Sequence, residues 1–411
     1  MSQKPLIFHI DVNSAYLSWT AVNELKKGRE EDLRLTASAI GGNREKRHGI
    51  ILAKSSIAKS YGVQTGEPVA AALKKCPGLS LFPPDFELYD QNSRAFIEIL
   101  GRYSPLVEQF SIDEAFMDMT GTELLFGPPL KAAASIQHSI SEELGFTVNI
   151  GISENRFLAK MASDFEKPNK IHTLFPKEVP EKMWPLDIRE LFMVGHSAEN
   201  TLRSLGIHTI GDLAKCNPAT IKAHLKKHGE LLHRYACGED DGAFLSHEAK
   251  EKGVGNSTTL PYDVDSADVA RNVLLSLCET VCTRLRHENL KASLVSVRIT
   301  DWNFVNHTHQ RILPVLTNIT GEIFTAAAAL FDEMWDGTPI RLLGIQTGRL
   351  SGKSYRQYHL FDTEKFDKLE KLDSCVDEIR QKFGEDSIKR ASFLNSDTYR
   401  LVGGISKDRR R

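Results

Sequence analysis

The chain has 411 residues, of which 41% are hydrophobic and 26% are charged, and its formal net charge is −2. This composition is that of a globular protein, and the length indicates two to four domains because it exceeds what one hydrophobic core usually serves. It excludes a membrane-spanning protein, since no apolar run reaches the roughly 18 to 20 residues that a bilayer requires, and the small net charge weighs mildly against a nucleic-acid-binding protein.

The N-terminus does not have the features of a signal peptide, because its apolar stretch is short and contains His9, Asp11 and Asn13. The six cysteines are scattered, and no two of them form a C-x-x-C pair. We therefore expect reduced thiols and no zinc site. Since the sequence has neither a membrane-spanning apolar run nor a signal peptide, we expect a cytoplasmic protein without a membrane partner.

The first 165 residues alternate between strand and helix patterns. The apolar run at 5–12 predicts a buried strand, and a basic turn at 44–48 separates two further strands. The other predicted elements are helices at 14–27, 55–61, 90–102, 130–144 and 155–165, strands at 36–40, 49–53 and 147–152, and a hairpin at 106–119. This order is typical of an α+β sheet with helices on one face.

The remaining chain is helical at 185–238 and returns to an α+β pattern at 256–350. There we expect strands at 257–260, 292–300, 309–314 and 341–350, with helices at 269–288 and 322–335. The charged, glycine-containing stretch between these regions indicates a linker. A polar tail follows, with one predicted helix at 363–383.

Three carboxylates lie at the ends or turns of predicted strands and are candidates for a shared site. Asp11 lies at the end of the first predicted strand, and Asp113 and Glu114 lie in the turn of the predicted hairpin. If both belong to one sheet, the three side chains converge at its rim, and adjacent buried acids favour a cation as partner. Carboxylates are the oxygen ligands that Mg²⁺ prefers.

Simpler interpretations exist for each acid taken alone. Asp11 is also suited to capping the helix that follows it, and Asp113-Glu114 to a solvated turn. The metal interpretation depends on the combination of these acids with the motifs around them.

Three segments carry those motifs: Ile10-Asp11-Val12-Asn13-Ser14-Ala15-Tyr16, Phe110-Ser111-Ile112-Asp113-Glu114-Ala115-Phe116 and Gly151-Ile152-Ser153-Glu154-Asn155 with the Ala159-Lys160-Met161-Ala162-Ser163 that follows. In content, order and spacing they resemble the bacterial Y-family DNA polymerases of the UmuC/DinB type. The resemblance extends over about residues 5 to 350.

The resemblance implies a multidomain α+β protein with a palm, small fingers, a helical thumb containing a helix-hairpin-helix, and an α+β little finger. On this basis we expect the palm at 1–23 and 85–167, the fingers at 24–84 and the thumb at 168–238. A linker at 239–252, the little finger at 253–350 and a tail at 351–411 complete the expected layout.

The resemblance also implies site residues. Asp11, Asp113 and Glu114 are expected to be catalytic and to bind two Mg²⁺ ions, together with the carbonyl group of Val12. Tyr16 is at the position of the aromatic residue that excludes a ribonucleotide 2′-hydroxyl, although a core aromatic is the simpler alternative. Lys160 matches a triphosphate-binding lysine, and an ordinary surface lysine is its alternative.

The fingers depart from the family pattern. Where many relatives place Thr, Tyr and Arg against the triphosphate, this chain has Ala53, Ser56 and Lys59. Ser56 and Lys59 are still expected to contact the nucleotide, but Lys59 lacks the two-pronged geometry of arginine. The rate and the nucleotide affinity, rather than the type of reaction, depend on these changes.

Two further motifs concern partners. Gly195 and Gly206 belong to a hairpin expected to bind DNA phosphates through backbone N–H groups, although Met193 replaces its usual first glycine. In the tail, Gln357, Leu360 and Phe361 resemble the bacterial motif that binds the sliding clamp, and packing against the chain's own domain is the alternative.

The resulting hypothesis is a low-fidelity, template-directed translesion DNA polymerase that adds dNTPs to a primer and lacks proofreading. Its expected partners are primer-template DNA and the sliding clamp, and a nucleoid-associated monomer is expected. A non-catalytic accessory factor that binds DNA and the clamp is the first alternative. A palm-type nucleotidyl cyclase is the second, and the thumb and clamp motifs weigh against it.

Overall fold

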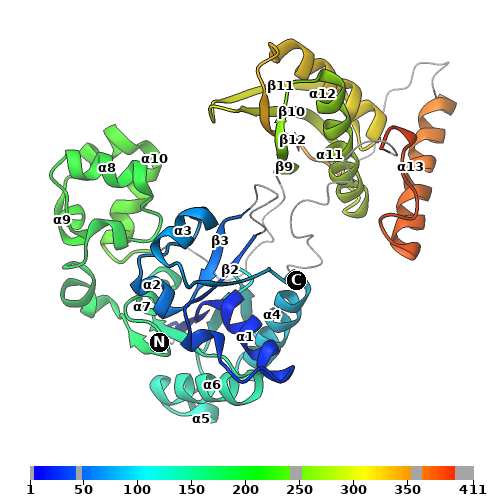
Figure 1. Ribbon diagram of the computed structural model, residues 1–411. Coiled ribbons are helices and arrows are strands. Elements are labelled where there is room, and N and C mark those ends of the chain that lie inside the picture. Colours follow the sequence, from blue (N-terminus) through cyan, green and yellow to red (C-terminus); the bar gives the residue numbers. More distant parts are fainter. Residues whose placement is uncertain (1–3, 43–48, 241–251, 353–362, 394–411) are drawn as a thin grey trace. The chain divides into compact units, whose positions relative to one another are not determined.

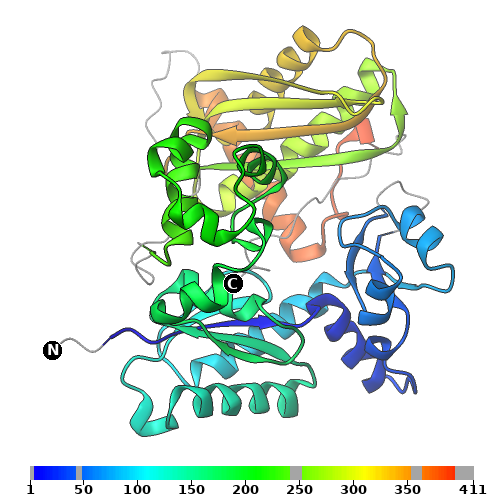
Figure 2. The same ribbon diagram turned by 90° about the vertical axis from the view of Figure 1, so that its left-hand side faces the viewer.

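The computed structural model describes residues 4–42, 49–240, 252–352 and 363–393 (Figures 1 and 2). The predicted basic turn at 44–48 and the predicted clamp motif at 357–361 lie outside the described residues. The described residues form two compact units, one up to residue 240 and one from residue 252 onward.

The first unit is built on a five-stranded sheet with the order β5-β6-β1-β7-β8. The central strand β1 (Ile7–Val12) pairs antiparallel with both of its neighbours. The other strands are β5 (Val107–Gln109), β6 (Glu114–Asp118), β7 (Val148–Ser153) and β8 (Ile171–Thr173). All six residues of β1 are buried, which explains its nearly continuous apolar sequence.

Helices cover both faces of this sheet. α4 (Phe86–Gly101) and α6 (Pro129–Leu144) form one core with Phe8 and Ile10 of β1. The short helix α7 (Arg156–Asp164) packs on the opposite side against β7 and β1. The predicted α+β class is confirmed, and α7 adds a helix on the second face. α1 (Ala15–Lys26) follows β1 directly, and α5 (Glu123–Phe126) is a single turn before α6.

A smaller three-stranded sheet lies between α1 and α4 in the chain. Its order is β3-β2-β4, formed by β2 (Ser38–Gly41), β3 (Ile51–Lys54) and β4 (Ser80–Phe82). α2 (Ser56–Ser60) and α3 (Val69–Lys75) accompany it, and Ala39, Ile51 and Val69 share its core. The sequence patterns predicted β2, β3 and α2 but missed α3 and β4.

The chain then becomes helical, as predicted. The helices are α8 (His196–Ser204), α9 (Ile210–Lys215) and α10 (Pro218–Ala236), preceded by short irregular turns. Their core includes Leu202 and Leu232 and continues into α7 through Phe157 and Met161. α7 therefore links the five-stranded sheet to the helical segment.

The second unit contains a four-stranded antiparallel sheet with the order β11-β10-β12-β9. Its strands are β9 (Gly253–Val264), β10 (Ala292–Asp301), β11 (Asn306–Thr317) and β12 (Ile340–Gly348). α11 (Ala267–His287) and α12 (Thr320–Met334) pack against the sheet in a single core. β9 is much longer than the strand predicted at 257–260.

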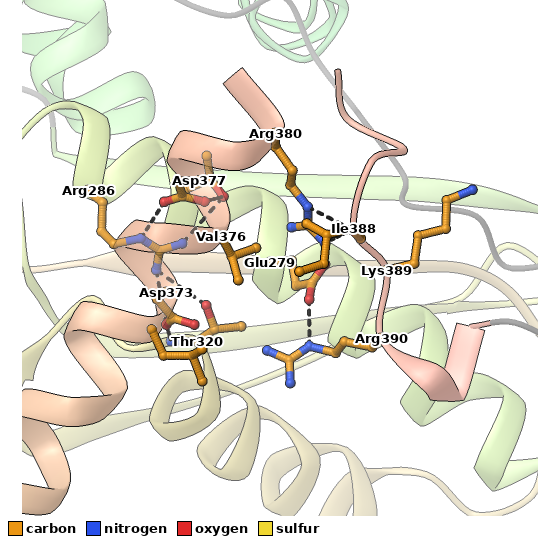
Figure 3. Close-up of a pocket in the computed structure, with 12 residues that line it drawn as sticks. Glu279, Arg286, Thr320, Asp373, Val376, Asp377, Arg380, Ile388, Lys389 and Arg390 are labelled. Carbon is orange, nitrogen blue, oxygen red and sulfur yellow. Dashed lines mark hydrogen bonds and ion pairs between the residues drawn. The ribbon is translucent and has the colours of Figure 1, made fainter. Parts of the chain in front are cut away.

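The last described helix, α13 (Thr363–Phe383), docks on α11 through charged side chains (Figure 3). Glu279 of α11 accepts hydrogen bonds from Arg380 at 3.2 Å and from Arg390 at 2.5 Å. Arg286 of α11 donates to Asp377 at 2.6 Å. These pairs line a small cavity of about 150 Å³ and hold the C-terminal segment on the second unit.

Candidate active site

The register between β1 and β6 brings the predicted carboxylates together. Asp11 is directly opposite Glu114 in the antiparallel pair. Asp113 precedes Glu114, and its carbonyl oxygen accepts a hydrogen bond from Val12 N at 3.0 Å. All four residues line one cleft of about 470 Å³. The sheet therefore presents three acids at a single rim, as predicted.

Two lysines lie against these acids. Lys160 Nζ is 3.0 Å from Glu114 Oε2 and 3.2 Å from Asp164 Oδ2. Lys167 Nζ forms an ion pair with Asp11 and is 2.9 Å from Asp164 Oδ1. Asp11 and Glu114 thus each have a positive neighbour, whereas neither lysine pairs with Asp113.

Burial and charge act in opposite directions on the acids. Burial raises the pKa of Asp113, and the neighbouring charges of Asp11 and Glu114 raise it further. Burial also disfavours the ionised form of Glu114, but the hydrogen bond with His9 and the charge of Lys160 outweigh burial and lower its pKa to about 2. Burial opposes the charged form of Lys167, yet Asp11 and Asp164 raise its pKa overall. A positive charge placed beside Asp113 would therefore stabilise its ionised form.

The donor atoms at this rim suit a hard cation. Asp11, Asp113 and Glu114 offer carboxylate oxygens and Val12 a carbonyl, which are the ligand types that Mg²⁺ takes. Within the described part of the chain, however, no three His, Cys, Asp or Glu side chains are gathered closely enough to hold a metal ion. The ammonium groups of Lys160 and Lys167 supply the positive charge instead. The residue types and their shared position at the rim therefore suit a metal. Holding one would require the three carboxylates to move closer together and the two lysines to move away from them.

A buried histidine stands behind the carboxylates. His9 is fully buried on β1, with Nε2 3.2 Å from Glu114 Oε2 and Nδ1 2.7 Å from Ser163 Oγ. Burial lowers the pKa of His9, which keeps the imidazole neutral. The sequence prediction did not include this residue, because a histidine inside an apolar strand gives no functional signal by itself.

Tyr16 lies on α1 and lines the same cleft. Its ring stacks on Tyr89 of α4, with centroids 4.5 Å apart and an interplanar angle of 15°. The ring is therefore supported from behind by a fully buried aromatic side chain. The structure places Tyr16 both in the cleft and beside the core, so the two predicted interpretations are compatible.

The three-stranded sheet and α2 contribute two basic residues and a hydroxyl group to the cleft. Ser56 begins α2 and is exposed, and Lys59 follows one turn later. Both line the cleft, together with Lys54 of β3. Burial lowers the pKa of Lys54, and the charge of Lys59 lowers it further, so the two ammonium groups repel each other. Such a pair is a favourable environment for an anion.

Lys160 is more buried than expected for a triphosphate-binding lysine or for a surface lysine. Its side chain is 9% exposed and contacts Glu114, which lines the cleft, and Asp164. Lys167 is 38% exposed and lines the cleft directly. The sequence singled out Lys160 and missed Lys54 and Lys167. The available signal for Lys167 was its position beside Pro168, immediately after the third motif.

The predicted DNA-binding glycines flank α8. Gly195 is its N-cap, with extended backbone, and Gly206 follows the helix at a φ of +77°. A built Cβ meets nothing within 4 Å at either position, so both glycines are open to solvent. Met193 takes a φ of +73° and is half exposed, where the usual glycine would meet no strain.

Comparison with known proteins follows the same division of the chain. A sequence model of the impB/mucB/samB family matches residues 10–164, and one of the C-terminal domain of that family matches residues 251–360. The chain is 44% identical over 392 residues to DNA polymerase IV of Clostridium acetobutylicum, covering 95% of this chain and 99% of that relative. It is 35% identical over 409 residues to DNA polymerase IV 1 of Bacillus subtilis, covering 98% and 97%.

Among solved structures, a Y-family DNA polymerase chimera matches with a TM-score of 0.69 at 21% identity, covering 84% of this chain and 98% of the chimera. At this identity the match concerns the fold. It confirms the multidomain α+β architecture of palm, fingers, thumb and little finger. Within the described residues, no helix has the length and apolar character needed to cross a membrane.

Proposed function

This chain belongs to the impB/mucB/samB family, the bacterial UmuC/DinB branch of the Y-family DNA polymerases, and we propose that it is a template-directed DNA polymerase of the translesion type. Its substrates are primer-template DNA and dNTPs. The observation that carries the proposal is the single cleft lined by Asp11, Asp113 and Glu114 together with Tyr16, Lys54 of β3 and Lys59 of α2. The reaction depends on a divalent metal.

We assign the metal to Asp11, Asp113, Glu114 and the carbonyl of Val12, and we propose two Mg²⁺ ions. When bound, these ions lower the barrier for attack of the primer 3′-hydroxyl on the α-phosphate and stabilise the leaving pyrophosphate. The protein positions the carboxylates through the strand register between β1 and β6. Ser111 Oγ also donates to Asp113 Oδ1 at 2.6 Å and so fixes that side chain.

For the triphosphate, we assign the exposed positive side chains of the cleft. Lys54, Lys59 and Lys167 line it, and the hydroxyl of Ser56 adds a donor. Lys167 pairs with Asp11, and it would be available to a phosphate if a cation took its place beside that carboxylate. Lys160 remains a candidate for the same role, but its contacts with Glu114 and Asp164 favour a function in neutralising the acids.

Selection against ribonucleotides is assigned to Tyr16, because its ring is supported by Tyr89 and cannot retreat easily. The fingers carry small or flexible side chains at Ala53, Ser56 and Lys59, which leaves room for distorted bases. Loose enclosure of the base pair is a physical source of low fidelity.

The remaining assignments concern partners and layout. We propose DNA phosphate contacts at the backbone of Gly195 and Gly206, and clamp binding by Gln357, Leu360 and Phe361. We also propose the domain limits stated from the sequence, a monomer, and a cytoplasmic, nucleoid-associated location. These assignments are supported by the family and by the position of each motif in the chain.

Primer extension tests the activity. The wild type and the Asp113→Ala/Glu114→Ala variant are given a primed template, four dNTPs and Mg²⁺. Extension by the wild type alone supports both the polymerase and its acids. If neither protein extends the primer, although both are folded and bind DNA, the non-catalytic accessory factor becomes the better explanation.

A further inference from the structure

His9 joins two elements behind the carboxylate rim. It lies on β1 two residues before Asp11, and its fully buried ring contacts Glu114 on β6 and Ser163 on α7. Ser163 is also fully buried. A buried ring whose two nitrogens each meet a side chain is held in a single orientation.

The hydrogen-bond roles of the ring follow from its neighbours. An ionised carboxylate only accepts hydrogen bonds, so His9 Nε2 carries the hydrogen that faces Glu114. In the neutral ring, Nδ1 is then an acceptor, and Ser163 Oγ is the group that can donate to it. Ser163 has a single hydroxyl hydrogen, which it donates either to His9 Nδ1 or to the carbonyl oxygen of Lys160, 2.8 Å from Ser163 Oγ.

The contacts on Glu114 use one oxygen. His9 Nε2 at 3.2 Å and Lys160 Nζ at 3.0 Å both meet Oε2. The other oxygen, Oε1, is therefore the one that remains for a cation. Lys160 is itself a cation and would compete with a metal for Glu114, whereas a ring N–H donor at Oε2 would leave Oε1 open to the metal.

We propose that His9 is a positioning residue of the metal site: backed by Ser163, it holds Oε2 of Glu114 and leaves Oε1 as the metal ligand. This inference rests on the proposed metal-dependent polymerase. Groups that orient a metal ligand contribute about 10- to 100-fold to metal affinity. His9 therefore acts on metal binding without touching substrate.

The test measures metal binding without turnover. Each protein is bound to a dideoxy-terminated primer-template and a dNTP, and free Mn²⁺ is followed by electron paramagnetic resonance. We expect His9→Phe to weaken Mn²⁺ binding about tenfold or more, and Ser163→Ala to weaken it less. His9→Gln, whose amide can donate to Glu114, recovers part of the affinity.

Phe116→Leu is the matched control. The Phe116 ring lies 4.6 Å from the His9 ring on the same face of the sheet, so this change disturbs the packing and leaves the hydrogen bonds to Glu114. It is expected to bind Mn²⁺ like the wild type. Circular dichroism checks that every variant is folded.

Folded His9→Phe protein with wild-type Mn²⁺ affinity would overturn the inference. If His9→Phe does not fold, unchanged affinity in Ser163→Ala overturns it instead. Equal losses of Mn²⁺ affinity in Phe116→Leu and His9→Phe would show that His9 acts only through packing, which would also overturn the inference. A wild type that neither binds Mn²⁺ nor extends a primer contradicts the proposed function itself, which separates the two failures.

Discussion

Asp11 and Glu114 are directly opposed residues on two antiparallel strands, β1 and β6. Directly opposed residues project their side chains on the same face of a sheet, so the register alone brings both carboxylates to one side. A slip of one residue would send one of them to the apolar face that α4 and α6 cover. The placement of these two carboxylates therefore depends on the same strand pairing that holds the core together.

Gly151 tests how closely α7 is packed on this sheet. A Cβ at Gly151 would lie 2.0 Å from Ala159 O and 2.4 Å from Ser163 N, which are backbone atoms of α7. Because backbone cannot move aside as a side chain can, Gly151→Ala should force α7 away from β7. We expect a loss of about 3 kcal/mol in the free energy of unfolding, measured by urea denaturation.

Gly101→Ala provides the control for that measurement. Gly101 ends α4, and a Cβ there meets nothing within 4 Å. We expect its stability to change by less than about 1 kcal/mol. Equal stabilities of the two variants would contradict the close approach of α7 to β7.

Gly151 also illustrates what the sequence could and could not predict. The third motif marked Gly151, and the strand and helix patterns around it were correct, because long periodic segments carry their own signal. The reason for the glycine lies in the distance between β7 and α7, which no local pattern contains. The fold class was predicted from the order of the elements. The rim formed by Asp11, Asp113 and Glu114 was predicted from the end of the first strand and the turn of the hairpin.

The misses have a common physical origin. β4 and β8 have three residues each, and α3 has seven, so they are too short for a clear periodicity. Lys167 meets Asp11 across 156 positions of sequence through a turn, and His9 meets Ser163 across 154. Such contacts are products of the tertiary structure, and a single sequence shows only the residues that make them.

The free energy of unfolding should fall at alkaline pH because the thiol of Cys282 on α11 is buried. Burial raises the pKa of Cys282 to about 12 from its ordinary value near 9. The unfolded chain therefore loses this proton first as the pH rises, and stability that is fully present below pH 9 declines above it. The loss attributable to Cys282 is about 1.4 kcal/mol per pH unit.

Urea unfolding of the wild type and of Cys282→Ala between pH 7 and pH 10 checks this. The alanine variant is less stable at pH 7 because of its cavity, but this deficit should shrink above pH 9. Cys375→Ala on α13, where the thiol is exposed, should follow the wild type at every pH. A constant difference between wild type and Cys282→Ala would refute the prediction.

Glu279 should control the docking of α13. Its side chain is 5% exposed and pairs with Arg380, which is 6% exposed, and with Arg390. Glu279→Gln leaves a buried guanidinium without its counter-charge, a change that costs about 3 to 5 kcal/mol. We expect faster limited proteolysis within 363–393 and a lower unfolding temperature of the second unit.

Two further variants make that result specific. Asp386→Asn removes a surface pair with Lys389, in which Asp386 is 78% exposed, and should cost less than about 1 kcal/mol. Glu279→Met with Arg380→Met replaces the buried pair by apolar groups and should recover most of the stability. Protease resistance in Glu279→Gln equal to that of the wild type would show that the pair does not hold α13.

Tyr16 should decide the choice between deoxyribonucleotides and ribonucleotides. Its ring lies in the cleft and is braced by Tyr89, so a 2′-hydroxyl placed against it finds no room. Tyr16→Ala removes the obstacle and should raise the relative kcat/KM for ribonucleotides by about tenfold or more, equal to about 1.4 kcal/mol of discrimination.

Tyr89→Phe is the control, because it keeps the supporting ring and loses only the hydroxyl near Thr20. Single-nucleotide incorporation with paired dNTP and rNTP measures the ratio. If the ratio in Tyr16→Ala equals that in Tyr89→Phe, Tyr16 is a core residue that happens to border the cleft, and ribonucleotides are excluded by another group.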